Sequence, residues 1–136
     1  MSRTLLIVFS VLSFLLCALV GADGANHPAR EGHAELRALA LAPEKARVSR
    51  NPYKDRPDAI RAGEKLFRQH CAECHGEDGR GLGRAADLRS PGVQNATPGE
   101  LEWLLRNGNL SKGMPSWSGL PAQRRWQIVT YLKSLR

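Results

Sequence analysis

Five consecutive residues, Cys71-Ala72-Glu73-Cys74-His75, carry the strongest chemical signal in this sequence. They have the form C-x-x-C-H, which is the attachment pattern of a c-type haem. One turn of chain places two thiols with this spacing on the same side, where they can form thioether bonds to the two vinyl groups of a porphyrin. The imidazole of His75 then projects toward the iron and can bind it as the proximal axial ligand. The sequence therefore predicts one covalently bound haem c, held by Cys71, Cys74 and His75.

Other interpretations of this stretch are weaker. A structural zinc site needs four ligands, usually from two cysteine pairs, and the only other cysteine of the chain is Cys17. A thioredoxin-type dithiol lies in a βαβ unit, and no strand pattern surrounds this stretch. An accidental C-x-x-C-H on a surface helix is the remaining alternative. Because haem attachment uses Cys71 and Cys74, neither of them is left for a disulfide.

Residues 1–22 have the composition of an export signal. Arg3 supplies the positive start, residues 5–20 form a nearly continuous apolar run, and Val20-Gly21-Ala22 supplies small residues for cleavage. The apolar run is slightly long for a signal core and short for a spanning helix, so an uncleaved membrane anchor is the alternative. Both interpretations place the rest of the chain outside the cytoplasmic membrane, because Arg3 stays inside. We therefore predict a periplasmic or otherwise exported protein.

The length of the chain suits one domain, and its charge is basic. The 136 residues include 20 Lys or Arg against 13 Asp or Glu, which gives a formal net charge of +7. From Asp58 onward there are twelve Lys or Arg and eight Asp or Glu. Long-range charge of this kind speeds association with partners of opposite sign. We expect the partner to be a redox protein with an acidic face, and not a nucleic acid.

Residues 23–57 are interpreted as an extension that precedes a haem domain at residues 58–136. The segment His33 to Ala42 predicts a short helix, because its apolar residues fall near one face. Prolines at positions 43, 52 and 57 interrupt the remainder of the extension. We expect a solvated, partly ordered linker that wraps the domain, with His27 and His33 as exposed side chains.

Three longer helices are predicted after the extension. Asp58 is expected to cap a helix that runs to about Cys71. Thr97-Pro98-Gly99-Glu100 is a capping box with proline at the first helical position, and its helix should end at Gly108. Pro121 should open a last helix that reaches about Leu135. Residues 76–98 are rich in glycine and poor in apolar residues, so they are predicted to be a loop.

Several patterns in this order resemble class I cytochromes c, the small exported monohaem cytochromes of bacteria. They are Gly63-x-x-x-Phe67-x-x-x-Cys71-x-x-Cys74-His75, the loop Gly76 to Gly83, Gly113-Met114-Pro115-x-Trp117, and Trp126 to Leu132. The resemblance covers about residues 58–136. It implies that Gly63 and Phe67 pack across Tyr131 on the last helix. Many members of the family have a proline whose carbonyl accepts the proximal histidine N–H, but here that neighbourhood is Arg84-Ala85-Ala86, so another carbonyl must take over.

The same resemblance implies that Met114 binds the iron opposite His75. Met114 is the only methionine after the signal, and Pro115 stiffens its loop. The alternative is a methionine that fills a gap in the core. His70 is too close in sequence to the attachment stretch to reach over the ring, whereas Lys112 could replace Met114 at high pH.

These patterns predict an all-α fold, in which about three core helices and several loops surround one haem. They imply an electron carrier, not an enzyme, that passes one electron between exported or membrane redox proteins such as a dehydrogenase, an oxidase or another cytochrome. One alternative is a cytochrome subunit held permanently by a larger dehydrogenase or oxidase, with residues 23–57 as the tether. A haem peroxidase or sensor is less well supported, because it needs an exchangeable sixth site and a distal acid-base residue.

Overall fold

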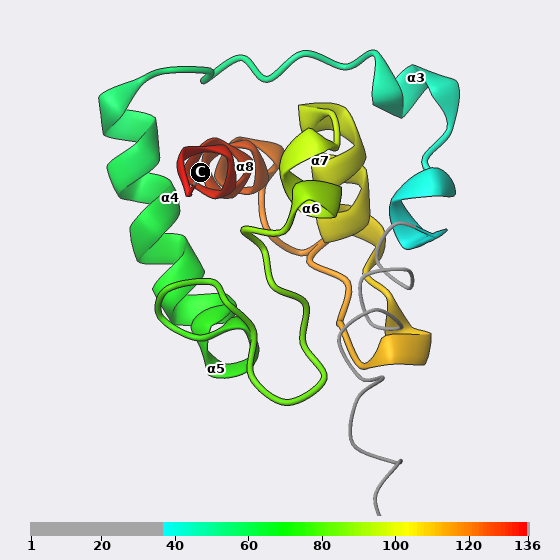
Figure 1. Ribbon diagram of the computed structural model, residues 1–136. Coiled ribbons are helices and arrows are strands. Elements are labelled where there is room, and N and C mark those ends of the chain that lie inside the picture. Colours follow the sequence, from blue (N-terminus) through cyan, green and yellow to red (C-terminus); the bar gives the residue numbers. More distant parts are fainter. Residues whose placement is uncertain (1–36, 136) are drawn as a thin grey trace, which may run out of the picture.

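The structure is a computed structural model that describes residues 37–135 (Figure 1). The predicted export signal, Cys17, His27, His33 and the first residues of the helix predicted from His33 lie outside the described residues. Residues 37–40, which belong to that predicted helix, are helical. Between residues 37 and 135, no helix combines the length and the apolar character needed to cross a bilayer.

The described part of the chain is built from helices and loops, which confirms the predicted all-α class. An antiparallel bridge between Asn109 and Met114 is its only β-type pairing. After the helical turn at residues 37–40, the helices are α3 (Glu44–Arg47), α4 (Pro57–His70), α5 (Ala72–His75), α6 (Pro91–Asn95), α7 (Pro98–Asn107), the 3₁₀ helix η2 (Leu110–Lys112) and α8 (Ala122–Ser134).

Helix α4 begins two residues earlier than predicted, because Arg56 and not Asp58 is its N-cap residue. Arg56 is the N-cap residue, it makes no side-chain cap, and Pro57 takes the first helical position, where its fixed φ suits the helix. The Asp58 carboxylate lies inside the first turn and forms an ion pair with Arg56, with 2.7 Å between Nη2 and Oδ2. The hydrogen bond from Arg56 holds the pKa of the Asp58 carboxyl below its usual range.

Helix α7 follows the sequence prediction closely. The Thr97 hydroxyl accepts a hydrogen bond from the Glu100 N–H at 3.2 Å, and the Glu100 carboxylate accepts one from the Thr97 N–H at 2.7 Å. These two bonds satisfy donors that the start of a helix leaves unpaired. The helix ends at Asn107, before Gly108.

The prediction of an uninterrupted loop over residues 76–98 is wrong for Pro91–Asn95, which form α6. Pro91 occupies the first helical position after Ser90, which is a recognisable helix start. The turn is too short to show a helical repeat of apolar residues, but it buries Val93. Helix α6 lies beside α7 in Figure 1.

Helices α4 and α8 pack against each other and form the main helix pair of the fold. They meet at Gly63, where a Cβ atom would overlap the carbonyl oxygen of Gln127 and lie 2.9 Å from Cβ of Tyr131. The rings of Phe67 and Tyr131 lie beside this contact, with 5.3 Å between their centroids. The predicted contact between Gly63, Phe67 and Tyr131 is therefore confirmed.

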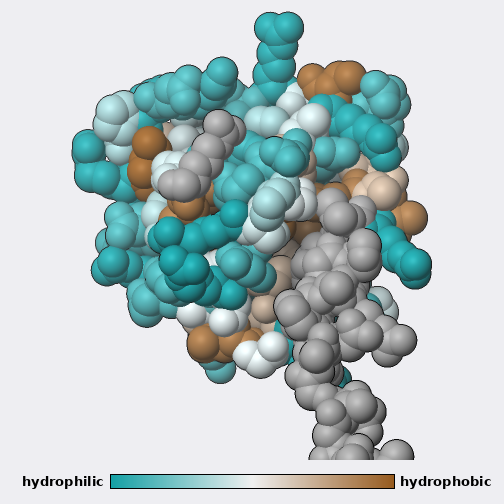
Figure 2. Space-filling view, in the orientation of Figure 1, coloured by the Kyte–Doolittle hydropathy of each residue, from teal (hydrophilic) through white to brown (hydrophobic). Residues whose placement is uncertain are grey.

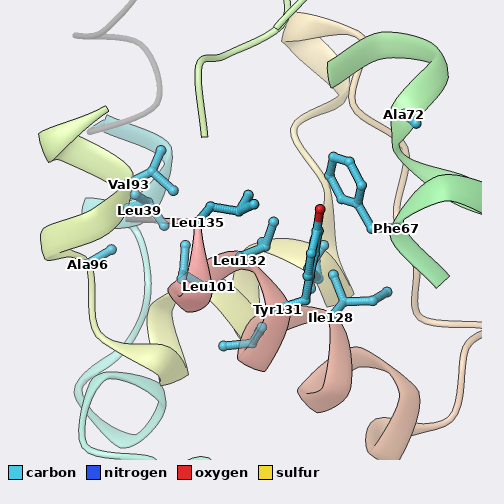
Figure 3. Close-up of a cluster of buried hydrophobic side chains, with 12 residues drawn as sticks. Leu39, Phe67, Ala72, Val93, Ala96, Leu101, Ile128, Tyr131, Leu132 and Leu135 are labelled. Atoms are coloured by element: carbon cyan, nitrogen blue, oxygen red, sulfur yellow. The ribbon is translucent and has the colours of Figure 1, made fainter. Parts of the chain in front are cut away.

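A single cluster of buried apolar side chains connects the helices (Figure 3). Phe67 from α4 and Ile128 and Val129 from α8 are its most completely buried large side chains. Hydrophilic residues cover most of the face seen in Figure 2. Four large apolar side chains are exposed in the described residues: Leu41, Val48, Leu82 and Leu110.

Residues 37–57 wrap the rest of the fold, as Figure 1 shows, but they are more than a solvated linker. Ala38, Leu39 and Ala42 are buried, and Leu39 belongs to the same cluster as Phe67. The expectation of a solvated linker fails because these apolar side chains pack on the domain, which removes their surface from water.

We predict that replacing Gly63 with leucine lowers the free energy of unfolding by about 1–3 kcal/mol, because the side chain must push α4 away from α8. Chemical denaturation of the haem-containing protein would measure the change. Lys65→Leu is the matched control, since Lys65 is exposed on the same helix. Equal stability of the parent and the Gly63→Leu protein would contradict the close contact.

Candidate haem site

A cavity of about 580 Å³, partly open to the surface, lies between the helices. This volume is typical of pockets that hold small molecules and cofactors. Its wall is mainly apolar and comes from almost every part of the described fold. The apolar lining includes Ala38, Leu39, Phe67, Leu82, Leu88, Val93, Leu101, Leu104, Leu105, Ile128 and Leu132.

The attachment stretch forms one side of this cavity. Cys71 follows the last residue of α4, and Cys74 and His75 lie on α5. The N–H groups of Cys74 and His75 both donate to the Cys71 carbonyl, at 3.1 and 2.9 Å, which fixes the turn between the two cysteines. All three side chains line the cavity, and the two cysteines form no disulfide. Burial raises the pKa of the Cys71 thiol to about 12, so it is a neutral thiol near pH 7.

The imidazole of His75 is held in one orientation by the backbone. Its Nδ1 lies 3.0 Å from the carbonyl oxygen of Ala86. A carbonyl only accepts hydrogen bonds, so Nδ1 carries the proton and Nε2 keeps its lone pair for a metal. A hydrogen bond of this kind sets the ring orientation and the basicity of a metal-binding histidine. Ala86 thus supplies the carbonyl that the sequence alone did not identify.

The loop after α5 brings Ala86 to this position. The N–H of Gly81 donates to the His75 carbonyl at 2.8 Å, and the N–H of Leu82 donates to the Cys74 carbonyl at 2.9 Å. Gly81 has φ +84°, and a Cβ there would lie 2.9 Å from the Ala86 carbonyl oxygen. Glycine is therefore required for the loop to fold back under the histidine.

Met114 reaches the same cavity from a distant part of the chain. The residue is half-buried, and its backbone is held by two hydrogen bonds with Asn109, Asn109 N–H to Met114 O at 2.9 Å and Met114 N–H to Asn109 O at 3.1 Å. The Trp117 N–H donates to the Leu105 carbonyl at 2.9 Å, which ties the end of the loop to α7. In Figure 1 this loop (orange) and α5 lie well apart at the lower end of the molecule.

The other candidate ligands have different surroundings. His70 also lines the cavity, and its ring packs against that of Trp117, with 5.2 Å between the ring centroids. Lys112 lines the cavity but is exposed. Between residues 37 and 135, no group of three or more His, Cys, Asp or Glu side chains forms a separate metal site.

A buried ion pair beside the methionine loop was missed in the sequence. Arg125 Nε lies 2.8 Å from Glu102 Oε1, and the two side chains are 8% and 13% exposed. The Arg125 guanidinium also donates to the carbonyls of Ser118 and Leu120. These bonds connect the end of the loop to α7 and α8. No sequence signal distinguished Arg125 from the other basic residues of the chain.

The wall formed by Ala38 and Leu39 was also missed, because residues 23–57 were interpreted as a linker. The only hint in the sequence was the helical spacing of apolar residues between His33 and Ala42.

Comparison with known proteins agrees with this geometry. Residues 58–132 match the family described as cytochrome C oxidase, cbb3-type, subunit III, and the chain belongs to this family of c-type cytochromes. Its fold is similar to that of cytochrome cL from Methylophaga aminisulfidivorans, with a TM-score of 0.56, 23% identity, and coverage of 85% of this chain and 71% of that chain.

Three curated relatives share about a third of their aligned residues with this chain. Quinohemoprotein alcohol dehydrogenase ADH IIB of Pseudomonas putida is 30% identical over 88% of this chain and 19% of its own. Cytochrome c550 of Pseudomonas aeruginosa is 32% identical over 63% of this chain and 62% of its own. The cytochrome bc1 complex cytochrome c subunit of Corynebacterium diphtheriae is 32% identical over 62% of this chain and 31% of its own. The chain spans less than two thirds of each of these relatives.

The cofactor of this family is haem c, bound covalently. The cavity fits such a group, because it is large, mainly apolar, and bordered by two unpaired thiols, a histidine with a free Nε2 and a methionine sulfur. The predicted class I cytochrome is thereby confirmed.

We predict that the haem stays with the polypeptide after acid–acetone extraction and denaturing electrophoresis. Replacing Cys71 or Cys74 with serine leaves at most one thioether, so the yield of haem-containing protein should fall strongly. Pigment that extracts freely from the parent protein would contradict covalent attachment.

Proposed function

We propose that Cys71 and Cys74 attach the haem, that His75 and Met114 are its two axial ligands, and that the protein is an electron carrier. The observation that carries this proposal is that all four side chains line one mainly apolar cavity. When bound there, haem c supplies an iron that accepts and returns one electron.

The residues of the site suit this role. His75 is held by the Ala86 carbonyl, so the ligand needs little rearrangement when the charge of the site changes. A methionine sulfur favours the ferrous state and raises the reduction potential. If His75 and Met114 both bind the iron, the chain would leave no coordination site for a substrate, which supports a carrier and not an enzyme. A peroxidase or sensor would require Met114 to leave.

The proposed partners are other redox proteins. Two relatives are named as a quinohemoprotein dehydrogenase and as a subunit of a cytochrome bc1 complex, which favours a dehydrogenase, oxidase or other cytochrome as donor or acceptor. The match covers only 19% of the first and 31% of the second, so domains similar to this chain occur within larger chains. This observation supports the second candidate, a cytochrome subunit held by a larger complex. The molecular mass of the purified protein in solution would separate the two.

We further propose export, on the evidence of residues 1–22. Cleavage after Ala22 would leave a periplasmic protein, and an uncleaved segment would tether it to the outer side of the cytoplasmic membrane. The amino-terminal sequence of the protein purified from cells that mature c-type cytochromes would decide between these outcomes.

We predict that Met114→Ala opens the iron to external ligands, lowers the reduction potential and abolishes the weak red charge-transfer band of a methionine-ligated ferric haem. Met114→His should stay low-spin at a lower potential, because imidazole favours ferric iron more than a thioether does. Absorption spectra and redox titrations would measure both effects.

Leu110→Ala is the control for these variants, since Leu110 lies in the same loop and is 75% exposed. It should keep the parent spectrum and potential. If Met114→Ala also kept the charge-transfer band, the ligand assignment would fail, and a sensor or peroxidase would have to be reconsidered.

We also predict that electron transfer to an acidic partner slows by about tenfold as ionic strength rises from low to physiological, because salt screens the long-range attraction. Arg84 is exposed and lines the cavity, so Arg84→Gln should weaken this salt dependence. Arg124→Gln is the control, since Arg124 is exposed on α8 and is not among the residues that line the cavity. Stopped-flow rates that stay constant or rise with salt would show that the basic charge does not guide docking.

A further inference from the structure

The segment before the family's domain forms part of the wall of the haem cavity. Ala38 and Leu39 line the cavity together with Cys71 and His75, although the family match begins at residue 58. Leu39 is only 4% exposed and belongs to the central apolar cluster. In Figure 3 its side chain lies beside that of Val93, at the side of the cluster opposite Phe67.

Leu39 lies at the side of this cavity that is next to an outer groove. It also lines a second, shallower groove of about 470 Å³, which Arg47, Pro91 and Glu100 border. One side chain therefore faces the cavity on one side and the outer groove on the other. Shortening that side chain would join the two spaces and admit water to the cavity.

Specific backbone contacts hold the segment in place. The guanidinium of Arg47 donates to the carbonyl of Ala40, the last residue of the helical turn that carries Leu39, at 2.7 Å, and to that of Ala42 at 2.9 Å. The same guanidinium lies 3.8 Å from the carboxylate of Glu100 on α7. The turn is thus tied to α7 through a residue of α3.

Two further contacts attach the segment to the helices. At Gly99, near the start of α7, an added Cβ would overlap the carbonyl oxygen of Ala46, so the chain at Ala46 lies directly on the backbone of α7. The Asn51 amide donates to the Thr130 hydroxyl at 2.9 Å and to the Trp126 carbonyl at 3.3 Å on α8. Residues 37–57 therefore have a defined path across α7 and α8.

We propose that residues 37–57 are a strap that completes the haem pocket, and that Leu39 is a positioning residue that keeps water from the haem and thereby raises its reduction potential. This inference rests on the haem site proposed above. Ferric haem carries one more positive charge than ferrous haem, and water stabilises the more charged state, so a drier pocket favours the reduced form.

The match to the quinohemoprotein dehydrogenase agrees with this role for the segment. Residues 58–136 make up little more than half of the chain, whereas that match covers 88% of it. The matched region therefore includes residues 37–57. A simple tether between the membrane and the haem domain would need no apolar side chain inside the cavity.

The test compares the haem-containing proteins Leu39→Ala and Leu39→Ser with the parent by redox titration and by denaturation. Both variants should have a lower reduction potential, and serine should lower it more, because it is polar. Leu41→Ser is the first control, since Leu41 lies two residues away and is 73% exposed. It should leave the potential at the parent value.

Val129→Ala is the second control. It separates the effect of keeping water from the haem from the effect of losing a buried side chain in the core. Val129 is 0% exposed in the same cluster but is not part of the cavity wall, so its loss should lower stability and leave the potential unchanged. If the Leu39 variants were less stable but kept the parent potential, Leu39 would be a packing residue only and the inference would be wrong.

A variant outside the cavity tests the strap independently of Leu39. Gly99→Ala should displace the chain at Ala46 and shift the potential in the same direction as the Leu39 variants. Gly119→Ala is its control, since a Cβ at Gly119 has no atom within 4 Å. If Gly99→Ala kept the reduction potential of the parent, the inference that residues 37–57 complete the haem pocket would be wrong. Absence of covalent haem or of the methionine band in the parent would instead overturn the proposed site.

Discussion

The close crossing of α4 and α8 at Gly63 is the contact on which the rest of this structure depends. Since Gly63 has no side chain, the backbone of α8 at Gln127 lies directly against α4. The crossing places Phe67 and Ile128 in the cavity wall, and it fixes where the carboxyl end of α4 points. The attachment stretch begins at that end, so the position of both cysteines is set by a contact made two turns earlier. A domain of this size has a small apolar core, and several residues of that core also line the haem cavity.

Local chemistry explains why parts of the fold were predictable. The capping box at Thr97 and Glu100 pairs backbone donors within four residues. This helix start could therefore be predicted from the local sequence alone. The attachment stretch was likewise recognisable from five consecutive residues, and the contact of Gly63 with Tyr131 followed from the resemblance to class I cytochromes c. The cap prediction at Asp58 failed where two start signals competed, and Pro57 took the first helical position.

The features that sequence reasoning missed depend on contacts between distant residues. The carbonyl that accepts the His75 N–H comes from Ala86, eleven positions later in the chain. The close contact of Gly81 with the backbone at Ala85 and Ala86, which brings this carbonyl into place, is visible only once the loop is folded. Arg125 and Glu102 are 23 positions apart, and each resembles an ordinary surface charge until α7 and α8 are placed together. Leu39 was assigned to a linker because its partners, such as Val93, come more than fifty residues later.

The hydrogen bond to His75 has a consequence for changing the properties of this protein. Its acceptor is a main-chain oxygen, which every amino acid at position 86 would supply. Substitution of the side chain at that position therefore still leaves a backbone carbonyl to accept the hydrogen bond from His75. Engineering of this hydrogen bond must therefore act on the path of the loop that carries Ala86, for example at Gly81, and not on the side chain at position 86.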